Sequence, residues 1–506
     1  MIRPPPTRPR PLGRHGRQAV RRIVGASALA MLAACASGAR KPDLTLPAAY
    51  EAPRGDSGLP SQALDRWWTI FGDPELDALE DQALRASPDA TTQEARLEEA
   101  IATRKSTVLQ TYGSGGIKGS TTPQKAYPVG PVPSSLFPVG GYTETDQLAF
   151  SPSWEIDFLG GLRDERRAAR ADFAATRFDI ESARASLVAN VADEYFQARG
   201  LSIQIADAEE TEKIEDQLLE TATIRSDRGL GERSDADRIA GDLAGAKSQL
   251  SDLRAQQHAA ARLLLILVGR GPDPVESLPL SADVPEPPPT PRAVPGELLV
   301  RRPDVREAAA RMRAAAYRTK LAKEELFPNL TLTPALGILR QVAPGVGLAS
   351  LMPLILFPEE QTTTTAYWSM GIGIDQPVLD IPHLLQDAKA QGARTEQAVV
   401  AYEQAVQNAY GDAENALVEL ASDEARIQIL EDGERRARRA YDDEQTRYHA
   451  GLEDVTSVLS AEQTWRADRT QLTSERVQAL RRAVQTYKAL GGGWESQPIQ
   501  TAARAP

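Results

Sequence analysis

The sequence is poor in the residues on which most enzyme sites depend. It has a single cysteine, which excludes a disulfide framework and a four-cysteine zinc site, and its four histidines show no metal-ligand spacing. No run of 18 apolar residues occurs, so no ordinary membrane-spanning helix is expected. Aromatic residues make up only 5% of the chain, and the net charge of -12 disfavours a nucleic-acid partner. We therefore expect a mainly helical protein with no catalytic cofactor, no metal and no enzymatic activity.

The one cysteine lies directly after a targeting segment. Seven arginines and no acidic residue occur within residues 1–22, and a short apolar stretch follows. This pattern predicts an export signal over residues 1–34. The sequence Leu32-Ala33-Ala34-Cys35 resembles the lipobox of bacterial lipoproteins, in which the thiol receives a lipid and becomes the new N-terminus. The resemblance implies a covalent lipid on Cys35, a lipidated linker over residues 35–66 and, because Ala36 rather than aspartate follows, the outer membrane. An incidental cysteine after an ordinary cleavage site is the alternative.

The remaining chain contains an internal repeat. Three residues of one motif recur 222 positions later: Arg225, Gly229 and Leu230 as Arg447, Gly451 and Leu452. Leu250 and Gly269 recur at the same offset as Leu472 and Gly491. One register held through two glycine turns indicates a duplication rather than chance. We expect repeat 1 over residues 67–270, a proline-rich extended connector over 271–296, repeat 2 over 297–494 and a flexible tail over 495–506.

Each repeat contains a long helical hairpin. Proline-free tracts cover residues 162–228 and 384–450, with apolar residues three or four positions apart. Glycine turns at Gly229 and Gly451 reverse the chain into a second helical tract in each repeat. The apolar stripes predict coiled-coil packing.

Four segments before the long tracts alternate apolar and polar residues with a period of two. We expect strands at about residues 111–122 and 143–158 in repeat 1, and at about 329–340 and 364–379 in repeat 2. Aromatic residues on one face and small polar residues on the other are typical of membrane β-barrels, and four strands are too few to close one. Several chains would therefore have to combine their strands. A soluble four-stranded sheet covered by helices is the alternative.

Four motifs along the chain resemble those of one known family. In order they are Trp67-Trp68-x-x-Phe71-Gly72-Asp73-Pro74-x-Leu76, Leu298-Leu299-Val300-Arg301-Arg302-Pro303-Asp304, Phe327-Pro328-x-Leu330 and Tyr487-Lys488-Ala489-Leu490-Gly491-Gly492-Gly493-Trp494. With the lipobox and the duplicated hairpins they make the chain resemble the TolC-like outer membrane factors, in particular the lipoprotein branch that serves tripartite efflux pumps.

The resemblance implies a fold and a function. The fold would be mainly α with a small membrane β-barrel part, in which a homotrimer makes a twelve-stranded barrel continued by a long periplasmic α-helical barrel. The function would be passive efflux of small toxic compounds or drugs, received from a periplasmic adaptor protein and an inner-membrane transporter of the RND type. Outer-membrane lipid would surround the barrel.

Charged residues near the two glycine turns are candidates for a periplasmic gate, because the family closes its pore by inward coiling of helices. They are Asp235, Asp237, Arg238, Asp242, Glu453, Asp454 and Glu462. Charged rings can select ions in a pore. Ser460 stands where the family carries an aspartate, so Asp454 or Glu462 is expected to replace it. A solvated helix surface is the competing interpretation of each residue.

Two other classes of function remain open at this level. A type I protein secretion conduit would share the same fold. A lipidated periplasmic coiled-coil scaffold without a pore would share the helices but would have no need of the alternating strands.

Overall fold

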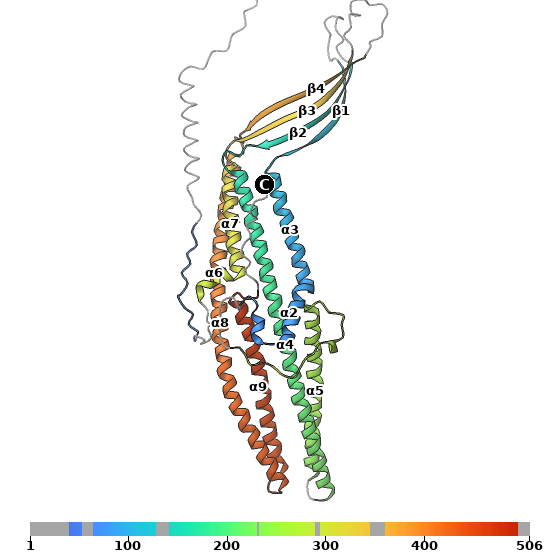
Figure 1. Cartoon of the computed structure of the whole chain (residues 1–506), viewed down its shortest axis with the longest axis vertical. Helices are drawn as coiled ribbons and strands as arrows, with labels where there is room; N and C mark the ends of the chain where they lie inside the picture. Colours follow the sequence, from blue (N-terminus) through green and yellow to red (C-terminus); the bar gives the residue numbers. More distant parts are fainter. Residues whose placement is uncertain are drawn as a thin grey trace, which may run out of the picture. The chain divides into compact units, whose positions relative to one another are not determined.

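The computed structural model describes residues 40–52, 64–127, 141–229, 232–288, 294–344 and 360–493 (Figure 1). The expected signal segment, Cys35 and the tail over residues 495–506 lie outside this described part. The chain divides into two compact units. The sheet unit contains residues 105–170 and 312–399, and the helical unit contains residues 43–104, 171–311 and those from 400 onward.

The sheet unit contains four long antiparallel strands in the order β1-β2-β3-β4. They are β1 (Ser114–Ala126), β2 (Gly141–Glu155), β3 (Asn329–Pro344) and β4 (Glu360–Asp375). The two hairpins of the duplication thus pair through β2 and β3, where Phe150 lies opposite Leu336. Among the described strands, β1 and β4 each have one pairing partner.

The strand ends differ from those expected from the alternating pattern. β1 begins three residues later than expected because α3 (Pro88–Gln110) runs up to a turn at residues 111–113, in which Gly113 has φ 125°. β2 ends at Glu155, although the apolar alternation continues to Phe158. The Asp157 carboxylate accepts hydrogen bonds from the backbone N–H groups of Gly160 and Arg163, which bends the chain into the next helix.

Two helical hairpins match the duplication. The first is α4 (Gly161–Asp227) with α5 (Arg233–Leu267), and the second is α8 (Ile381–His449) with α9 (Val455–Ala489). Gly229 and Gly451 both have φ 72°, a left-handed conformation that disfavours a side chain with a Cβ atom. The interior glycines of α4 and α8, such as Gly200 and Gly433, leave both helices unbroken.

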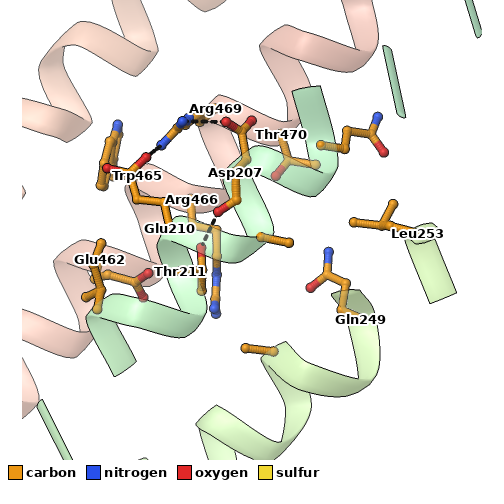
Figure 2. A pocket seen from close by; sticks show the side chains of 14 residues that line it. Asp207, Glu210, Thr211, Gln249, Leu253, Glu462, Trp465, Arg466, Arg469 and Thr470 are labelled. Atoms are coloured by element: carbon orange, nitrogen blue, oxygen red, sulfur yellow. Dashed lines mark hydrogen bonds and ion pairs between the residues drawn. The ribbon is translucent and has the colours of Figure 1, made fainter. Parts of the chain in front are cut away.

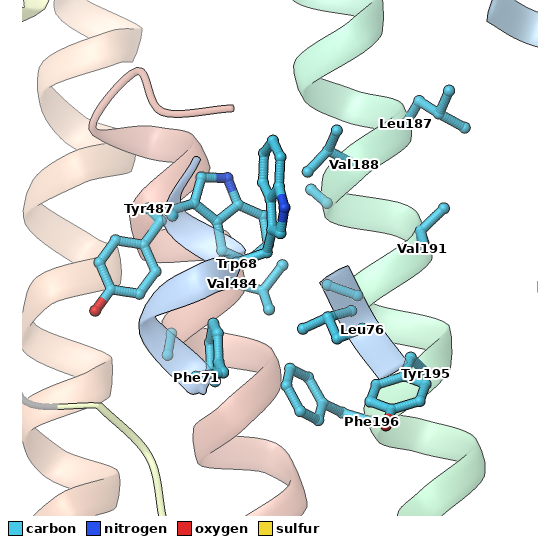
Figure 3. Packing of buried hydrophobic residues seen from close by; sticks show 14 of the residues in the cluster. Trp68, Phe71, Leu76, Leu187, Val188, Val191, Tyr195, Phe196, Val484 and Tyr487 are labelled. Carbon is cyan, nitrogen blue, oxygen red and sulfur yellow. The ribbon is translucent and has the colours of Figure 1, made fainter. Parts of the chain in front are cut away.

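Shorter elements complete the helical unit. They are η2 (Trp67–Phe71), α2 (Pro74–Ala86), η3 (Val275–Ser277), η4 (Pro295–Glu297), α6 (Leu298–Arg301) and α7 (Pro303–Glu324), the last of which extends beyond the unit's limit at residue 311. The segment before α2, the middle parts of α4 and α8 and the ends of α5 and α9 contribute to the main hydrophobic core. Figure 3 shows the part of this core that the first segment, α2, α4 and α9 supply. Trp67 stacks on Tyr487 with ring centroids 5.8 Å apart, and a Cβ on Gly492 would lie 2.9 Å from the Trp67 ring. The opening and closing motifs therefore build one core, which is a structural role.

Candidate functional site

The sheet has two chemically different faces. Directly paired residues of antiparallel strands share a face, so the register assigns each paired side chain to one of the two faces of the sheet. One face carries large exposed apolar residues: Ile117, Leu148, Phe150, Trp154, Leu336, Ile338, Trp368, Met370, Ile372 and Ile374. The other carries small or polar residues: Ser120, Gln147, Ser151, Thr331, Thr333, Thr365, Tyr367 and Ser369. Trp368 is 78% exposed, so nothing in the described part of the chain covers the apolar face there. A continuous exposed apolar face of this kind requires lipid or another protein to cover it.

The described helices do not supply a membrane crossing. None of them is both long and apolar enough to span a bilayer.

The two helix turns hold most of the gate candidates, and the structure gives each a place. Asp235 is half-buried in the first turn of α5, whereas Asp237 and Arg238 are exposed. The Arg238 guanidinium donates a hydrogen bond to Thr456 Oγ1 of α9 over 3.3 Å. It therefore links the ends of the two hairpins.

The candidates of repeat 2 have local roles in their own turn. Asp454 is the N-cap of α9, and its carboxylate accepts a hydrogen bond from the backbone N–H of Ser457 over 3.0 Å. Such a cap satisfies a backbone donor that the helix leaves free. Glu453 lies 3.7 Å from the guanidinium of Arg447, across Gly451. Both side chains are accessible enough to face an aqueous pore, and Ser460 is exposed as well.

Glu462 has a different environment from the one expected for a pore-lining acid. Its exposed fraction is 0%, so it lies inside the helix packing instead of on a surface. The prediction that Glu462 replaces the family's constricting aspartate therefore fails in this conformation. The helical period of α9 explains this burial, because Glu462 lies four residues after Val458 and on the same face.

Two ion pairs attach α9 to the helices on either side. Arg481 makes a bidentate pair with Asp193 of α4, with N–O distances of 2.9 and 2.8 Å. Arg476 pairs with Glu431 of α8 at 2.8 Å. A bidentate guanidinium–carboxylate pair fixes orientation as well as distance, so α9 is held in register with α4.

A second polar cluster surrounds Trp465 on α9 (Figure 2). Arg469 pairs with Asp207 and, at 2.6 Å, with Glu210, both on α4. The indole N–H of Trp465 donates to Glu434 of α8 over 2.8 Å. Its ring stacks on Tyr441 of α8 at 5.3 Å, and the Arg469 guanidinium lies 5.4 Å from the ring centroid. Trp465 and Arg469 together thus connect α4, α9 and α8.

A small cavity lies beside this cluster. Its volume is about 30 Å³, and its lining includes Glu462, Arg466, Gln249 and Thr470 (Figure 2). That volume matches a single water molecule, so the cavity is too small for a transported compound. Within the described residues, no group of three or more acidic, histidine or cysteine side chains is arranged to hold a metal ion.

Burial changes the acid–base properties of the carboxylates in this region. Burial, with the charges of Glu462 and Asp242, raises the pKa of Glu215 on α4 to about 7. Burial is also the main cause that raises the pKa of Glu462, and the positive charge of Arg466 opposes the rise. A carboxylate in a dry environment favours its neutral form.

Sequence reasoning missed Glu215, Arg466 and Arg469. A signal was available, because Glu462, Trp465, Arg466 and Arg469 follow one another at helical spacing on a single stripe of α9. Charges that interrupt an apolar stripe indicate a buried ionic cluster. The partner residues on α4 were not accessible from this pattern, because spacing within one helix does not show which neighbouring helix faces it.

These features define a class of protein. An amphipathic sheet that one chain leaves open, combined with duplicated helical hairpins, is the architecture of a channel subunit of the outer membrane.

Comparison with known proteins identifies the family. The sequence profile of the outer membrane efflux proteins matches residues 79–270 and 294–492. The chain belongs to this family of channel proteins, which confirms the resemblance inferred from its motifs. The scaffold without a pore is thereby ruled out as the class of this protein.

Individual relatives agree with the assignment. The pyoverdine export outer membrane protein OpmQ of Pseudomonas aeruginosa is 28% identical over 446 residues, which are 85% of this chain and 88% of the relative. The toluene efflux pump outer membrane protein TtgC of Pseudomonas putida is 24% identical over 463 residues, with coverage of 90% and 92%. The solved structure of the outer-membrane channel OprN superposes with a TM-score of 0.75 at 25% identity, covering 90% of this chain and 99% of the other. The fold is mainly helical with four strands per chain, as expected.

Proposed function

We propose that the chain is the outer-membrane exit duct of a tripartite efflux pump, through which small toxic compounds or drugs leave the cell passively. Three copies combine their strands into one barrel, and the assembly works with a periplasmic adaptor and an inner-membrane transporter of the RND type. The proposal assigns no chemical reaction to the chain. The protein supplies a path, and the transporter supplies the energy.

One observation carries this proposal: the sheet is amphipathic and, within the described part of the chain, open at both edges. In a bilayer, the backbone groups along β1 and β4 need hydrogen-bond partners, since hydrocarbon offers none. Pairing with the strands of sister chains satisfies them and at the same time turns the polar face toward an enclosed aqueous space.

Two neighbouring residues of β4 provide a matched test. Met370 lies on the apolar face opposite Pro334, and Ser369 lies on the polar face opposite Ala335. A lysine facing lipid costs up to about 2–4 kcal/mol per chain, whereas a lysine facing water costs little. We expect Met370→Lys to reduce the heat-modifiable trimer in outer-membrane extracts strongly. Ser369→Lys should assemble normally and lower the cation conductance of the purified trimer in planar bilayers. Equal tolerance of both lysines would contradict a lipid-facing sheet.

The nature of the cargo is supported by the relatives. The names of OpmQ and TtgC describe export of pyoverdine and efflux of toluene. This pairing favours a duct with broad tolerance for small molecules over a protein secretion conduit. Accumulation assays in a strain that lacks its own outer-membrane channels, with and without this gene and its neighbouring transporter, would identify the cargo.

A lipid anchor on Cys35 is part of the proposal. The lipobox residues support it. We expect labelled palmitate to be incorporated into the wild-type protein and not into Cys35→Ser. Incorporation into the variant at the wild-type level would refute the anchor.

The exposed charges at the helix turns are proposed to set the ion selectivity of the periplasmic entrance. Asp237, Glu453 and Asp454 are accessible, and acidic rings favour cations. Asp454→Asn retains a capping oxygen and removes the charge, so it should lower cation selectivity without unfolding the turn. Unchanged conductance and ion selectivity in Asp237→Asn, Glu453→Gln and Asp454→Asn trimers would remove all three from the entrance.

A further inference from the structure

Two carboxylates are fully buried in the contact between α4 and α9. Glu215 of α4 and Glu462 of α9 both have exposed fractions of 0%. None of their four carboxylate oxygens has a hydrogen-bond partner among the described residues. The Arg466 guanidinium, one turn beyond Glu462, lies 3.9 Å from Glu215 Oε1, too far for a hydrogen bond.

The charges around this pair are predominantly acidic. Asp242 on α5 and Tyr441 on α8 interact electrostatically with both carboxyl groups. Glu210 of α4 and Asp442 of α8 act on Tyr441 from nearby. The other guanidinium of the cluster, that of Arg469, already pairs with Asp207 and Glu210. Among the described residues, Arg466 is therefore the cation that acts on both Glu215 and Glu462, and a single positive charge does not compensate for two ionised carboxylates.

Burial without hydrogen bonds makes the ionised form of such groups costly. The packed contact between α4 and α9 therefore favours a state in which at least one of the two carboxyl groups is protonated. The charge of Glu462 adds to the effect of burial on Glu215, so ionisation of one carboxyl group makes ionisation of the other less favourable. The cavity beside Glu462 has room for one water molecule, which gives a starting point for hydration when the proton leaves.

We propose that Glu215 and Glu462 form a proton-dependent clasp, which holds α9 against α4 while the pair carries a proton and loosens this contact once both groups ionise. The clasp makes the packing of the two hairpins sensitive to the pH of the compartment around them. This inference depends on the proposed function in one respect: the proposed function places the two hairpins in a compartment outside the inner membrane.

The direction of the pH effect follows from linkage. The packed state binds the proton more tightly than a separated state, in which the carboxyl groups have ordinary pKa values near 4.5. Stability of the contact is fully present below that value and declines as the pH rises toward about 7, the pKa of Glu215 in the packed state. The effect is absent if neither carboxyl group can ionise.

Hydrogen exchange of the full-length trimer in detergent tests the clasp. Exchange of α4 and α9 peptides that contain the pair would be compared at about pH 5 and about pH 8 after correction for the intrinsic rate. We expect local opening to increase at least about tenfold at the higher pH in the wild type, and to become independent of pH in the Glu215→Gln/Glu462→Gln double variant. Glu220→Gln, an exposed position on the same helix, is the matched control and should retain the wild-type response.

A second variant keeps the test decisive if the double variant does not assemble. Arg466→Gln removes the opposing cation, so the pH at which the contact loosens should move upward. Equal corrected exchange at both pH values in the wild type, or an unchanged response in the double variant, would overturn the clasp. Failure of the trimer to conduct ions would instead refute the proposed function, without any effect on this exchange measurement.

Discussion

The two repeats have the same order of strands, helices and turns, but different charged residues attach the opening helix of each repeat to its long helix. In repeat 1, the Asp73 carboxylate caps α2 and pairs with Arg199 of α4, and both side chains are almost fully buried. In repeat 2, Arg302 precedes Pro303 at the start of α7 and pairs with Asp412 of α8, whose side chain is 59% exposed. Each copy thus ties its opening helix to its own long helix, with the signs reversed and with unequal burial.

The glycines at the turns are the same in both repeats because backbone geometry requires them, whereas the side chains between the turns differ. The turn glycines Gly229 and Gly451 have the same φ of 72°, and the terminal glycines Gly269 and Gly491 have φ 79° and 81°. The side chains between them diverged because α5 and α9 have different neighbours. Ion pairs of α9 reach both α4 and α8, through Arg469 and Arg476 for example, whereas the described pairs of α5 run to α4. A duplicated element keeps its turns and adapts its surface to its position.

The largest expected difference between the repeats concerns the two anchors. Asp73→Ala leaves the Arg199 guanidinium buried without its carboxylate, which should cost about 3–5 kcal/mol of stability. Asp412→Ala removes an exposed partner while Arg302 keeps Asp304, so the cost should be about 0–1 kcal/mol. Thermal unfolding of the two trimers in detergent measures both. Equal losses would show that the anchors are equivalent despite their unequal burial.

The next effect concerns Glu215, for which repeat 2 has Ala437 at the offset of 222. Its pKa of about 7 against an unfolded value near 4.5 means that its ionisation destabilises the fold as the pH rises between these values. At about 1.4 kcal/mol per unit, Glu215→Gln should raise the free energy of unfolding by up to about 3.5 kcal/mol at about pH 8 and by about 1 kcal/mol or less at about pH 5. Denaturant titrations at the two pH values check this. A gain that does not depend on pH would mean that the carboxyl group is not the cause.

A smaller difference is expected for helix glycines. A Cβ on Gly200 of α4 would lie 2.4 Å from Val477 Cγ2 of α9, whereas a Cβ on Gly433 of α8 meets nothing within 4 Å. Gly200→Ala should therefore destabilise by about 1–2 kcal/mol through overpacking. Gly433→Ala should stabilise by up to about 1 kcal/mol, because alanine favours the helix. Destabilisation by Gly433→Ala would reveal a close approach by another chain at this place in repeat 2.

The smallest expected difference is between the two turns themselves. Gly229→Ala and Gly451→Ala should each cost about 1 kcal/mol or slightly more, because alanine is strained at positive φ. Asparagine tolerates that conformation better, so the two Gly→Asn variants should recover part of the loss. Midpoints of thermal unfolding that differ strongly between the two alanine variants would show that one turn depends on more than its backbone.

Much of the fold could be predicted because it depends on local patterns. The period-two alternation located all four strands to within four residues, and the recurrence of Gly229 as Gly451 located both hairpins. The pattern failed at the strand ends, where Ile156 and Phe158 continue the alternation through a turn. Hydrophobic period does not distinguish a strand from the chain that leaves it, because a turn closed by Asp157 tolerates the same apolar residues.

The candidate site was less accessible to prediction, for a physical reason. The residues near the turns were chosen by charge and position, and the family resemblance suggested a pore-lining role for Glu462. The structure buries Glu462 together with Glu215, which lies 247 positions earlier in the chain (462 − 215 = 247). Burial of this kind arises from the packing of two helices of different repeats, and no spacing within one repeat encodes it.

The outer edges of β1 and β4, which pair with none of the described strands, also have a genetic consequence. A subunit that folds and joins its sisters but obstructs the passage would spoil every assembly that contains it. If normal and obstructing copies were made in equal amounts and mixed freely in threes, only about one assembly in eight would contain normal subunits alone. Such an allele would be dominant. An allele whose product cannot pair its edge strands would instead be recessive, because that product would never be incorporated.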